Sequence, residues 1–280
     1  MIPYRAMLDV PRDLVAMLAR RLRTERRARG TRKGTRALSC WYQALLVLVW
    51  YRKREDLTVL AAGFGISRAT AYRYRDEATT VLAQAAPDLH EALERVAQQG
   101  WSHVVLDGKL FRTDRAAATT TSVKGETINS WHSGKHHHSG GLVQAIMRPD
   151  GFPIWVSDTA PGHRHDMSLA RDTGALGALY WAASQLGLPT LADSGYEGAG
   201  QGVHTPIKQP RRGQVLAPGN QTYNLLLRSR RAIGERGFAL LTRRWRALQH
   251  TTASPSKISD FVQAALILTH YEHRYLPSSR

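Results

Sequence analysis

The sequence is poor in cysteine, in long apolar runs and in acidic residues. Its single cysteine, Cys40, excludes an intramolecular disulfide and a zinc site built from several cysteines, and it fits a reducing compartment. The longest apolar run, residues 44–50, is far shorter than the ~20 residues that a membrane-spanning helix needs. The N-terminus has no apolar signal core. We therefore expect a soluble, cytoplasmic protein with no membrane partner.

Acidic residues are outnumbered, since 39 lysines and arginines stand against 22 aspartates and glutamates. The formal net charge is +17 and the pI is near 10.6. This excess favours a nucleic-acid partner, because bound cationic side chains release the counterions condensed on phosphates. The alternative is a highly soluble protein from an organism with an arginine-rich proteome. The length allows one large domain or two modest ones.

The first hundred residues carry helical patterns. Residues 20–36, RRLRTERRARGTRKGTR, are dense in cations and are interrupted by Gly30 and Gly34. This segment is either an arm that follows a phosphate backbone or a solvated helix end and loop, and charge alone does not separate the two. Residues 41–51 are apolar on all sides, which predicts a buried helix.

Residues 56–78, DLTVLAAGFGISRATAYRYRDEA, have the spacing of two helices that meet at a sharp corner. Ala61 is small enough for a close helix approach, Gly65 can take the positive φ of the corner, and Ser67 can cap the second helix. This pattern predicts a helix-turn-helix whose second helix faces DNA with Arg68, Tyr72, Arg73 and Arg75. The alternative is an ordinary helical hairpin in an oligomerisation region.

After Gly100 the pattern changes to short apolar runs. Strands are predicted at residues 103–106, 142–147, 154–156, 188–193 and 203–207. Helices are predicted at residues 166–186, at 224–248 and from 255 onward. We therefore expect an all-helical region over residues 1–98 and a mixed α/β sheet domain over residues 99–280.

Two of the predicted strands end in an acid, VVLDG at Asp107 and LADSG at Asp193. If these strands are neighbours, both carboxylates emerge at one edge of the sheet, where α/β proteins bind ligands. Two adjacent carboxylates repel each other unless one is protonated or a cation bridges them. Hard oxygen ligands favour Mg²⁺ or Mn²⁺. The simpler alternative is that both aspartates are turn residues.

Glu235 is the only acid in RSRRAIGERGFALLTRRWR, residues 228–246. It is a candidate third carboxylate, although it can also pair with Arg231 one turn earlier. Pairing does not explain Gly234 and Gly237, because each glycine costs about 1 kcal/mol inside a helix relative to alanine. Small residues there would let the helix backbone lie close to the metal site or to DNA.

The histidine runs KHHHSG, residues 135–140, and GHRHD, residues 162–166, allow a zinc site. Adjacent histidines in a loop usually point apart, so a DNA-facing or hydrogen-bonded role is favoured. Asp166 follows the second run and can cap the helix that begins there.

Several motifs together resemble the DDE transposases of bacterial insertion sequences, most closely the IS-five group. The motifs are VVLDGKLFR, SGKHHHSGGLVQAI, APGHRHDMSLAR, LADSGYEG and NLLLRSRRAIGERGFALLTRRWR. The resemblance implies a ribonuclease-H-like catalytic domain with Asp107 on the first strand, Asp193 after the fourth strand and Glu235 on a late helix. It also places Lys135 and Asp166 on the active-site side.

The resemblance implies further roles for single residues. Asp107 would bridge two Mg²⁺ or Mn²⁺ ions, with Asp193 and Glu235 each holding one. Lys135, Arg228 and Arg231 would contact DNA. Arg231 and Glu235 match the family pattern, whereas Arg228 replaces a tyrosine and Thr242 replaces a lysine.

The activity implied by the resemblance is DNA transposition. Metal-dependent hydrolysis would free the 3′ ends of the element, which would then attack target DNA. The partners would be double-stranded DNA, as terminal inverted repeats and as target, and a second copy of the chain in the complex, at the bacterial nucleoid. Two alternatives stay open: a DNA-binding regulator that has lost catalysis, and a site-specific endonuclease that cuts without joining.

Overall fold

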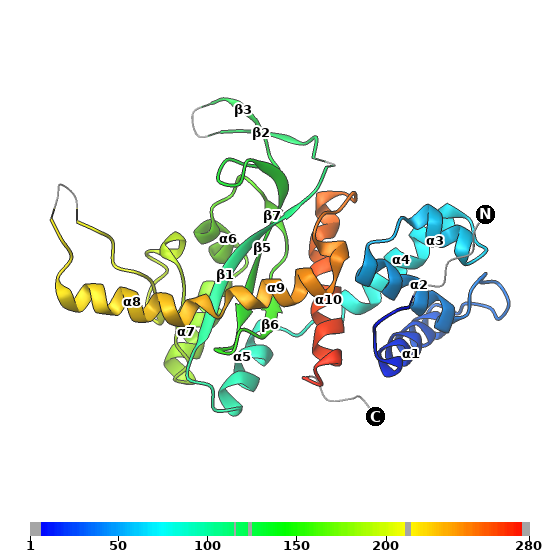
Figure 1. Ribbon diagram of the computed structural model, residues 1–280, viewed down its shortest axis with the longest axis horizontal. Helices are drawn as coiled ribbons and strands as arrows, with labels where there is room; N and C mark the ends of the chain where they lie inside the picture. Colours follow the sequence, from blue (N-terminus) through cyan, green and yellow to red (C-terminus); the bar gives the residue numbers. More distant parts are fainter. Residues whose placement is uncertain (1–6, 115, 123–124, 211–213, 276–280) are drawn as a thin grey trace. The chain divides into compact units, whose positions relative to one another are not determined.

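The computed structural model describes residues 7–114, 116–122, 125–210 and 214–275 (Figure 1). The chain forms two compact units. The first contains the chain up to Ala86, residues 241–249 and the segment from Asp260 onward. The second contains residues 87–240 and 250–259. This division differs from the expected boundary after residue 98, because the helix over residues 89–98 belongs to the second unit and two C-terminal segments belong to the first.

The first unit is built from helices. They are α1 (Arg12–Ala28), α2 (Cys40–Lys53), α3 (Leu57–Gly63), α4 (Arg68–Ala83) and most of α10 (Ile258–Glu272). Leu14, Leu18 and Leu22 repeat every four residues along α1 and are fully buried. The predicted buried helix is confirmed, because α2 buries residues on several sides. Trp245 completes this core, and its indole N–H donates to Thr269 Oγ1 at 2.9 Å.

The second unit contains a mixed sheet whose longest strands are β1 (Val104–Arg112) and β5 (His138–Met147). The strand order is β4-β5-β1-β8-β9, and β6 (Pro153–Val156) and β7 (Ala160–Pro161) also pair with β5. β1 runs antiparallel to β5 and parallel to β8 (Thr190–Leu191), which is parallel to β9 (Val203–His204). A short hairpin of β2 (Thr119–Thr121) and β3 (Thr127–Asn129) is separate, and β4 covers His132–Ser133. The expected mixed sheet is therefore present, with β1 as a central strand.

Helices cover both faces of this sheet (Figure 1). α5 (Leu89–Gln98), α6 (Asp166–Asp172) and α7 (Ala175–Gln185) form one layer, in which α7 contacts both other helices. α8 (Pro218–Ala232) and α9 (Glu235–Arg244) lie along the other face, where Phe238 packs edge-on against Phe111 of β1. Because successive residues of a strand face opposite sides of the sheet, Asp107 and Lys109 both point to the side opposite to the one that Gly108 faces.

Two predicted helices are broken in the structure. The expected helix over 224–248 ends at Ala232 and begins again at Glu235, and the helix over 166–186 is divided at Gly174, which has φ 72°. A Cβ on Gly234 would lie 2.6 Å from Val105 Cγ1, and one on Gly237 would lie 2.6 Å from Met147 Cγ. Both glycines therefore let the helix backbone touch the sheet, which is the packing reason that the sequence did not reveal.

Within the described residues, the longest helices are too short or too polar to cross a bilayer.

Candidate active site

Asp107 lies near the middle of β1, where it pairs with Ala145 of β5, two residues beyond the last pair of β1 with β8. Val104, Val105 and Leu106 before it are buried, so the strand carries the carboxyl group into a poorly solvated position. Burial, together with the nearby carboxylates of Asp193 and Asp166, raises the pKa of Asp107 to about 6. The Gly108 N–H donates to Asp107 Oδ1 at 2.9 Å and opposes this effect.

Asp193 is brought to Asp107 by the parallel pairing of β8 with β1. Val104 pairs with Thr190 and Val105 with Leu191, and Asp193 follows two residues after the last pair, near enough for its charge to raise the pKa of Asp107. The predicted neighbouring strands are therefore present. Asp193 also begins a short 3₁₀ helix, and its Oδ1 accepts from the Gly195 N–H at 2.8 Å. The turn role and the site role are thus compatible in one residue.

Asp166 is a third carboxylate at this place. Burial and the charge of Asp193 raise its pKa, whereas Lys135 lowers it, with Lys135 Nζ 3.7 Å from Asp166 Oδ2. The N-cap of α6 is His165, so Asp166 lies in the first turn rather than at the cap. Among the described residues, Asp166 Oδ1 is shielded from solvent and has no hydrogen-bond partner. Of the two roles that the sequence allowed, the structure supports the one near the active site.

Two glycines leave room for the three carboxylates. A Cβ on Gly108 would overlap Asp166 Oδ1, and a Cβ on Gly195 would lie 2.9 Å from Asp193 Oδ1. Neither glycine has a positive φ. Both glycines therefore allow the backbone to lie close to a carboxylate, and a larger side chain at either position would displace that carboxylate.

Tyr196 and Gln144 form the floor beneath the carboxylates. Both are fully buried. Gln144 Nε2 donates to the Tyr196 hydroxyl at 2.9 Å and to the backbone oxygen of Asp166 at 2.6 Å. Burial and the charges of all three aspartates raise the pKa of Tyr196 far above its usual range. Tyr196 was not among the residues predicted for the site, although the LADSG motif that precedes it allowed a turn.

The side chain of Glu235 lies outside the part of the chain that the structure describes. Its backbone begins α9, directly after Gly234 on the β1 face of the helix pair. Glu235 therefore stays a prediction as the third member of the expected acid set.

The basic side chains that were predicted to contact DNA near the site lie in different places relative to the carboxylates. Arg231 on α8 is half-buried and lowers the pKa of Asp107, so it lies within electrostatic range of the centre. Lys135 reaches the same centre through Asp166. Arg228, one turn before Arg231, is exposed on α8.

The donor set suits a hard divalent cation. The side chains that meet here offer carboxylate oxygens, the ligands that Mg²⁺ and Mn²⁺ prefer, and Asp166 Oδ1 is a buried acceptor without a donor. A cation would also relieve the mutual repulsion that raises the pKa of Asp107. Among the described side chains, no group of three acids, histidines or cysteines is arranged to hold a metal ion by itself.

Comparison with known families places the chain in a superfamily. Residues 106–270 match the model described as DDE superfamily endonuclease, and residues 36–88 match the helix-turn-helix of DDE superfamily endonuclease. The chain belongs to the DDE superfamily of endonucleases. A search of curated proteins gave no match. One solved structure, the crystal structure of a pre-cleavage Mos1 transpososome, is similar at 12% identity over 87% of this chain and 79% of that one, with a TM-score of 0.21.

The DNA-binding segment of this DDE endonuclease matches the predicted helix-turn-helix. α3 and α4 meet at Gly65, which has φ 65°, and Ser67 Oγ accepts from the Thr70 N–H at 3.2 Å to cap α4. Arg68 and Arg73 are exposed on α4, and Tyr72 is half-buried. The predicted corner and cap are therefore present in this family's DNA-binding domain.

Arg75 does not fit the expectation that it faces DNA. It is only 6% exposed, and its guanidinium lies 4.8 Å from the Tyr72 ring centroid, 5.0 Å from that of Trp50 and 5.3 Å from that of Phe261. It also donates to Asp76 Oδ1. Arg75 is therefore a packing residue of the helical unit, held by cation–π contacts.

Replacing Arg75 and Arg73 should separate stability from DNA binding. We expect Arg75→Ala to lower the free energy of unfolding by about 2–3 kcal/mol, because three rings lose their cation and its packed stem. We expect Arg73→Ala to leave stability within about 0.5 kcal/mol and to weaken DNA binding by roughly 1 kcal/mol. Chemical denaturation and fluorescence anisotropy with a 30-base-pair duplex measure the two effects. The reverse assignment of effects would contradict this placement of α4.

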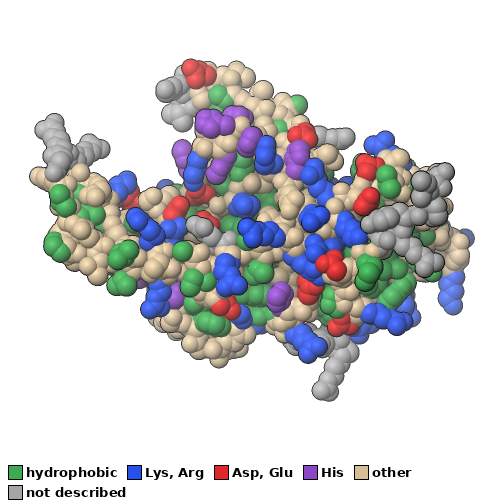
Figure 2. Space-filling model, viewed as in Figure 1, with side chains coloured by type: hydrophobic (Ala, Val, Ile, Leu, Met, Phe, Trp, Pro, Cys, Tyr) green, Lys and Arg blue, Asp and Glu red, His purple; other side chains and the backbone are tan. Residues whose placement is uncertain are grey.

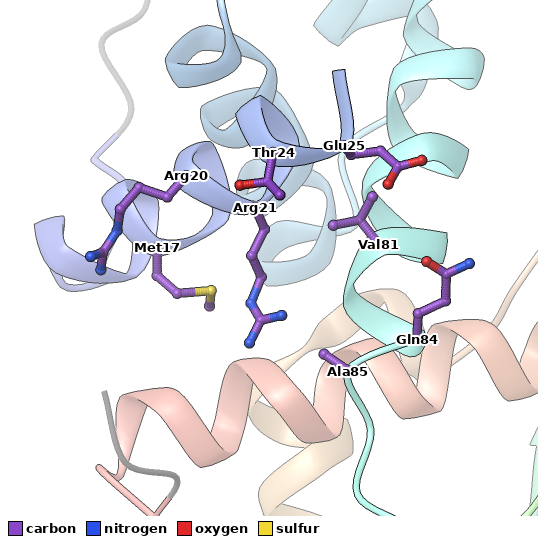
Figure 3. Close-up of a pocket in the computed structure, with 8 residues that line it drawn as sticks. All are labelled: Met17, Arg20, Arg21, Thr24, Glu25, Val81, Gln84 and Ala85. Atoms are coloured by element: carbon purple, nitrogen blue, oxygen red, sulfur yellow. The ribbon is translucent and has the colours of Figure 1, made fainter. Parts of the chain in front are cut away.

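The basic segment over residues 20–36 lines two pockets of the helical unit. The end of α1 and the following loop border one of about 500 Å³ whose cations are Arg23, Arg26, Arg27, Arg32, Lys33 and Arg36. A second, of about 570 Å³, lies between α1 and α4, where Arg21 extends beside Met17 and opposite Gln84 (Figure 3). Burial and the neighbouring Arg20 lower the pKa of Arg21. The segment is therefore a helix end with its loop and also a cation-lined surface. These features fit both alternatives, an arm that follows a phosphate backbone and a solvated helix end.

Proposed function

We propose that this DDE endonuclease is a transposase, which binds the ends of a transposable element, hydrolyses a phosphodiester bond there and joins the freed 3′ end to target DNA. The observation that carries the proposal is the meeting of Asp107, inside β1, with Asp193, just after the parallel strand β8, together with a raised pKa on Asp107. The finer placement is the IS-five-like group of bacterial insertion sequences. The chain would act as a homodimer on nucleoid DNA, since two ends must be paired.

Asp107, Asp193 and Glu235 would hold two Mg²⁺ or Mn²⁺ ions, and members of this superfamily are generally dependent on divalent metals. When bound, such ions activate a water or a 3′ hydroxyl and stabilise the leaving oxygen. Asp107 must be ionised for this role. Burial disfavours its ionised form, and Arg231 favours it.

The other residues of the site position charges and exclude water. Lys135 and Arg231 bring positive charge to the carboxylates, where a phosphodiester has to be held. Gln144 fixes the start of α6 through the backbone oxygen of Asp166. Tyr196 is fully buried and its pKa is strongly raised, so its hydroxyl is unsuited to act as a nucleophile. We propose a direct displacement at phosphorus, without a protein–DNA covalent link.

The test is nicking of DNA that carries the element's ends, using the DNA on both sides of the gene as substrate. We expect the wild-type chain to nick it with Mg²⁺ and to stop when EDTA is added. An Asp193→Asn variant should lose the activity by about 10²-fold or more, since removing charge stabilisation at a transition state has effects of this size. Nicking that survives this substitution undiminished would remove Asp193 from the site.

Joining separates the transposase from an endonuclease that only cuts. Precut ends incubated with plasmid DNA should yield strand-transfer products, and short inverted repeats should flank the gene. Cutting without joining would leave the endonuclease alternative. Binding that is equal with and without Mg²⁺, with no cleavage, would instead indicate a DNA-binding regulator.

A further inference from the structure

The β4–β5 hairpin is rich in histidine, and the proposed reaction assigns no role to these histidines. β4 and β5 pair antiparallel, with His132 opposite Ser139 and Ser133 opposite His138. The turn between them carries Lys135, whose Nζ lies 3.7 Å from Asp166 Oδ2 at the carboxylate centre. His137 and His138, two and three residues after Lys135, line a cavity of about 350 Å³. The hairpin therefore connects the candidate active site with this cavity.

Three segments of the second unit form this cavity. They are the end of β1, the β4–β5 hairpin and the residues at the start of the 250–259 segment, and Thr113 and Thr251 bridge the first and third. Figure 2 shows histidine side chains gathered in the upper part of the view with lysine and arginine side chains beside them. The donors that line the cavity are Arg112, His132, His137, His138, Ser139 and His250.

The hydrogen bonds in the cavity leave donors available. Arg112 NH2 lies 3.2 Å from His138 Nδ1, and a guanidinium can only donate, so Nδ1 accepts and the ring proton is on Nε2. His250 Nε2 lies 2.8 Å from Asp114 Oδ1, so the acid of this cavity already has a partner. His137 has φ 53°, a left-handed conformation that is uncommon outside glycine.

The lining selects an anion with several oxygens. Among the described residues these histidines do not form a group of three that could hold a metal ion. Guanidinium, imidazole and hydroxyl groups donate hydrogen bonds, and phosphate oxygens accept them. Arg112 supplies a permanent charge because its guanidinium does not deprotonate in proteins.

We propose that this cavity binds a backbone phosphate of the DNA that continues from the carboxylate centre. The assignment rests on the proposed function, because that function brings a DNA backbone across Asp107. Asp107 and Arg112 are five residues apart on β1, which is about 17 Å at a rise of roughly 3.3 Å per residue. This equals the axial rise of about five base pairs. Side chains five positions apart on a strand point to opposite faces, so the β4–β5 hairpin links the two places, with Lys135 at Asp166 and His137 in the cavity. The DNA backbone would follow this hairpin from the carboxylate centre to the cavity.

The test compares DNA binding by the full chain in EDTA, so that no cleavage is involved. The variant is Arg112→Gln/His138→Gln, and the matched control is His90→Gln/Arg171→Gln, which removes the same residue types from exposed positions outside the cavity. The probe is a fluorescein-labelled 30-base-pair duplex of mixed sequence, titrated at several salt concentrations. We expect the variant to bind about three- to tenfold more weakly and its log–log salt slope to fall by about 0.9, as for one lost phosphate contact. The control should keep the wild-type slope.

Each outcome separates this proposal from the proposed function. Equal affinity and slope in the variant and the control would overturn the phosphate site, whether or not the wild-type chain nicks DNA. Stoichiometric zinc that the wild type holds and the variant lacks, measured by elemental analysis, would overturn it as well. If Asp107→Asn binds like the wild type and the Arg112→Gln/His138→Gln variant does not, the phosphate site stands even where nicking fails. Circular dichroism on all variants excludes unfolding as the cause of a loss.

Discussion

An Asp107→Asn variant is expected to lose DNA nicking by about 10³-fold or more and, at the same time, to become more stable than the wild-type chain at pH 7.5 without metal. The activity falls because the central carboxylate of the metal site is gone, and such charge stabilisation contributes several kcal/mol to the transition state. The stability rises because asparagine keeps nearly the same shape and carries no charge in a buried position. Loss of function with gain of stability distinguishes a functional group from a structural one.

The direction of the stability change follows from the pKa. In the folded chain the pKa of Asp107 is raised from 3.8 to about 6, so between these values the folded state binds more protons than the unfolded state. The free energy of unfolding therefore falls as pH rises from about 4 to 6, and the full penalty is present above pH 6. A shift of this size corresponds to about 3 kcal/mol at most. The wild type and the variant should converge in stability near pH 4.

Denaturation at pH 4 and pH 7.5 in EDTA measures this effect. Asp150→Asn is a suitable control, because Arg148 and the Phe152 N–H lower the pKa of Asp150, so this substitution should destabilise the chain at neutral pH. Adding Mg²⁺ should stabilise the wild type and leave Asp107→Asn unchanged. An Asp107→Asn variant that is less stable than the wild type at pH 7.5 would contradict the burial of an ionised carboxyl group at this position.

Gly108→Ala is expected to abolish most activity without removing any charged group. The new Cβ would overlap Asp166 Oδ1 and would lie 3.3 Å from the Tyr196 hydroxyl, so the carboxylate or α6 must move. We expect a loss of about 10²-fold in nicking, which a displacement of about 1 Å is sufficient to cause. Overpacking should also cost about 1–3 kcal/mol of stability.

Gly177→Ala is the matched control for this substitution. Gly177 lies inside α7, and a Cβ there would meet no atom within 4 Å, so alanine should stabilise the helix by up to about 1 kcal/mol and leave nicking intact. Single-turnover nicking and denaturation of both variants decide the matter. Wild-type activity in Gly108→Ala would show that the close approach of β1 to Asp166 has no functional role.

Local patterns were sufficient to predict the strands that carry Asp107 and Asp193. The parallel pairing of β1 with β8 agrees with the expected neighbouring strands, and Asp193 does precede a turn. The first strand was expected to end at Asp107, whereas β1 continues through it to Arg112. The corner at Gly65 and the Ser67 cap were also readable, because both depend on residues a few positions apart. The family match bears out the helix-turn-helix, and the strand pairing bears out the mixed sheet.

The remaining features depend on contacts that sequence spacing does not contain. Arg75 has the helical position of a DNA-facing residue, but Trp50 and Phe261, from distant segments, bury it. An acid in the first turn of a helix is favourable in any protein, so Asp166 could not be assigned to the site before its neighbours were known. The break at Gly234 depends on Val105, and its contact with the sheet outweighs helix propensity.

In the proposed transposase, Asp107, Asp193 and Glu235 surround the same divalent ions. Replacing Mg²⁺ with Fe²⁺ and adding ascorbate and peroxide generates radicals that cut the polypeptide backbone within a short distance of the bound ion. Mass spectrometry of the protein fragments locates the cuts. We expect cuts at three separate segments, around residues 107, 193 and 235, which excess Mg²⁺ suppresses and which are lost in Asp107→Asn. Cuts confined to one of these segments, or clustered at the histidines of residues 132–138, would contradict it.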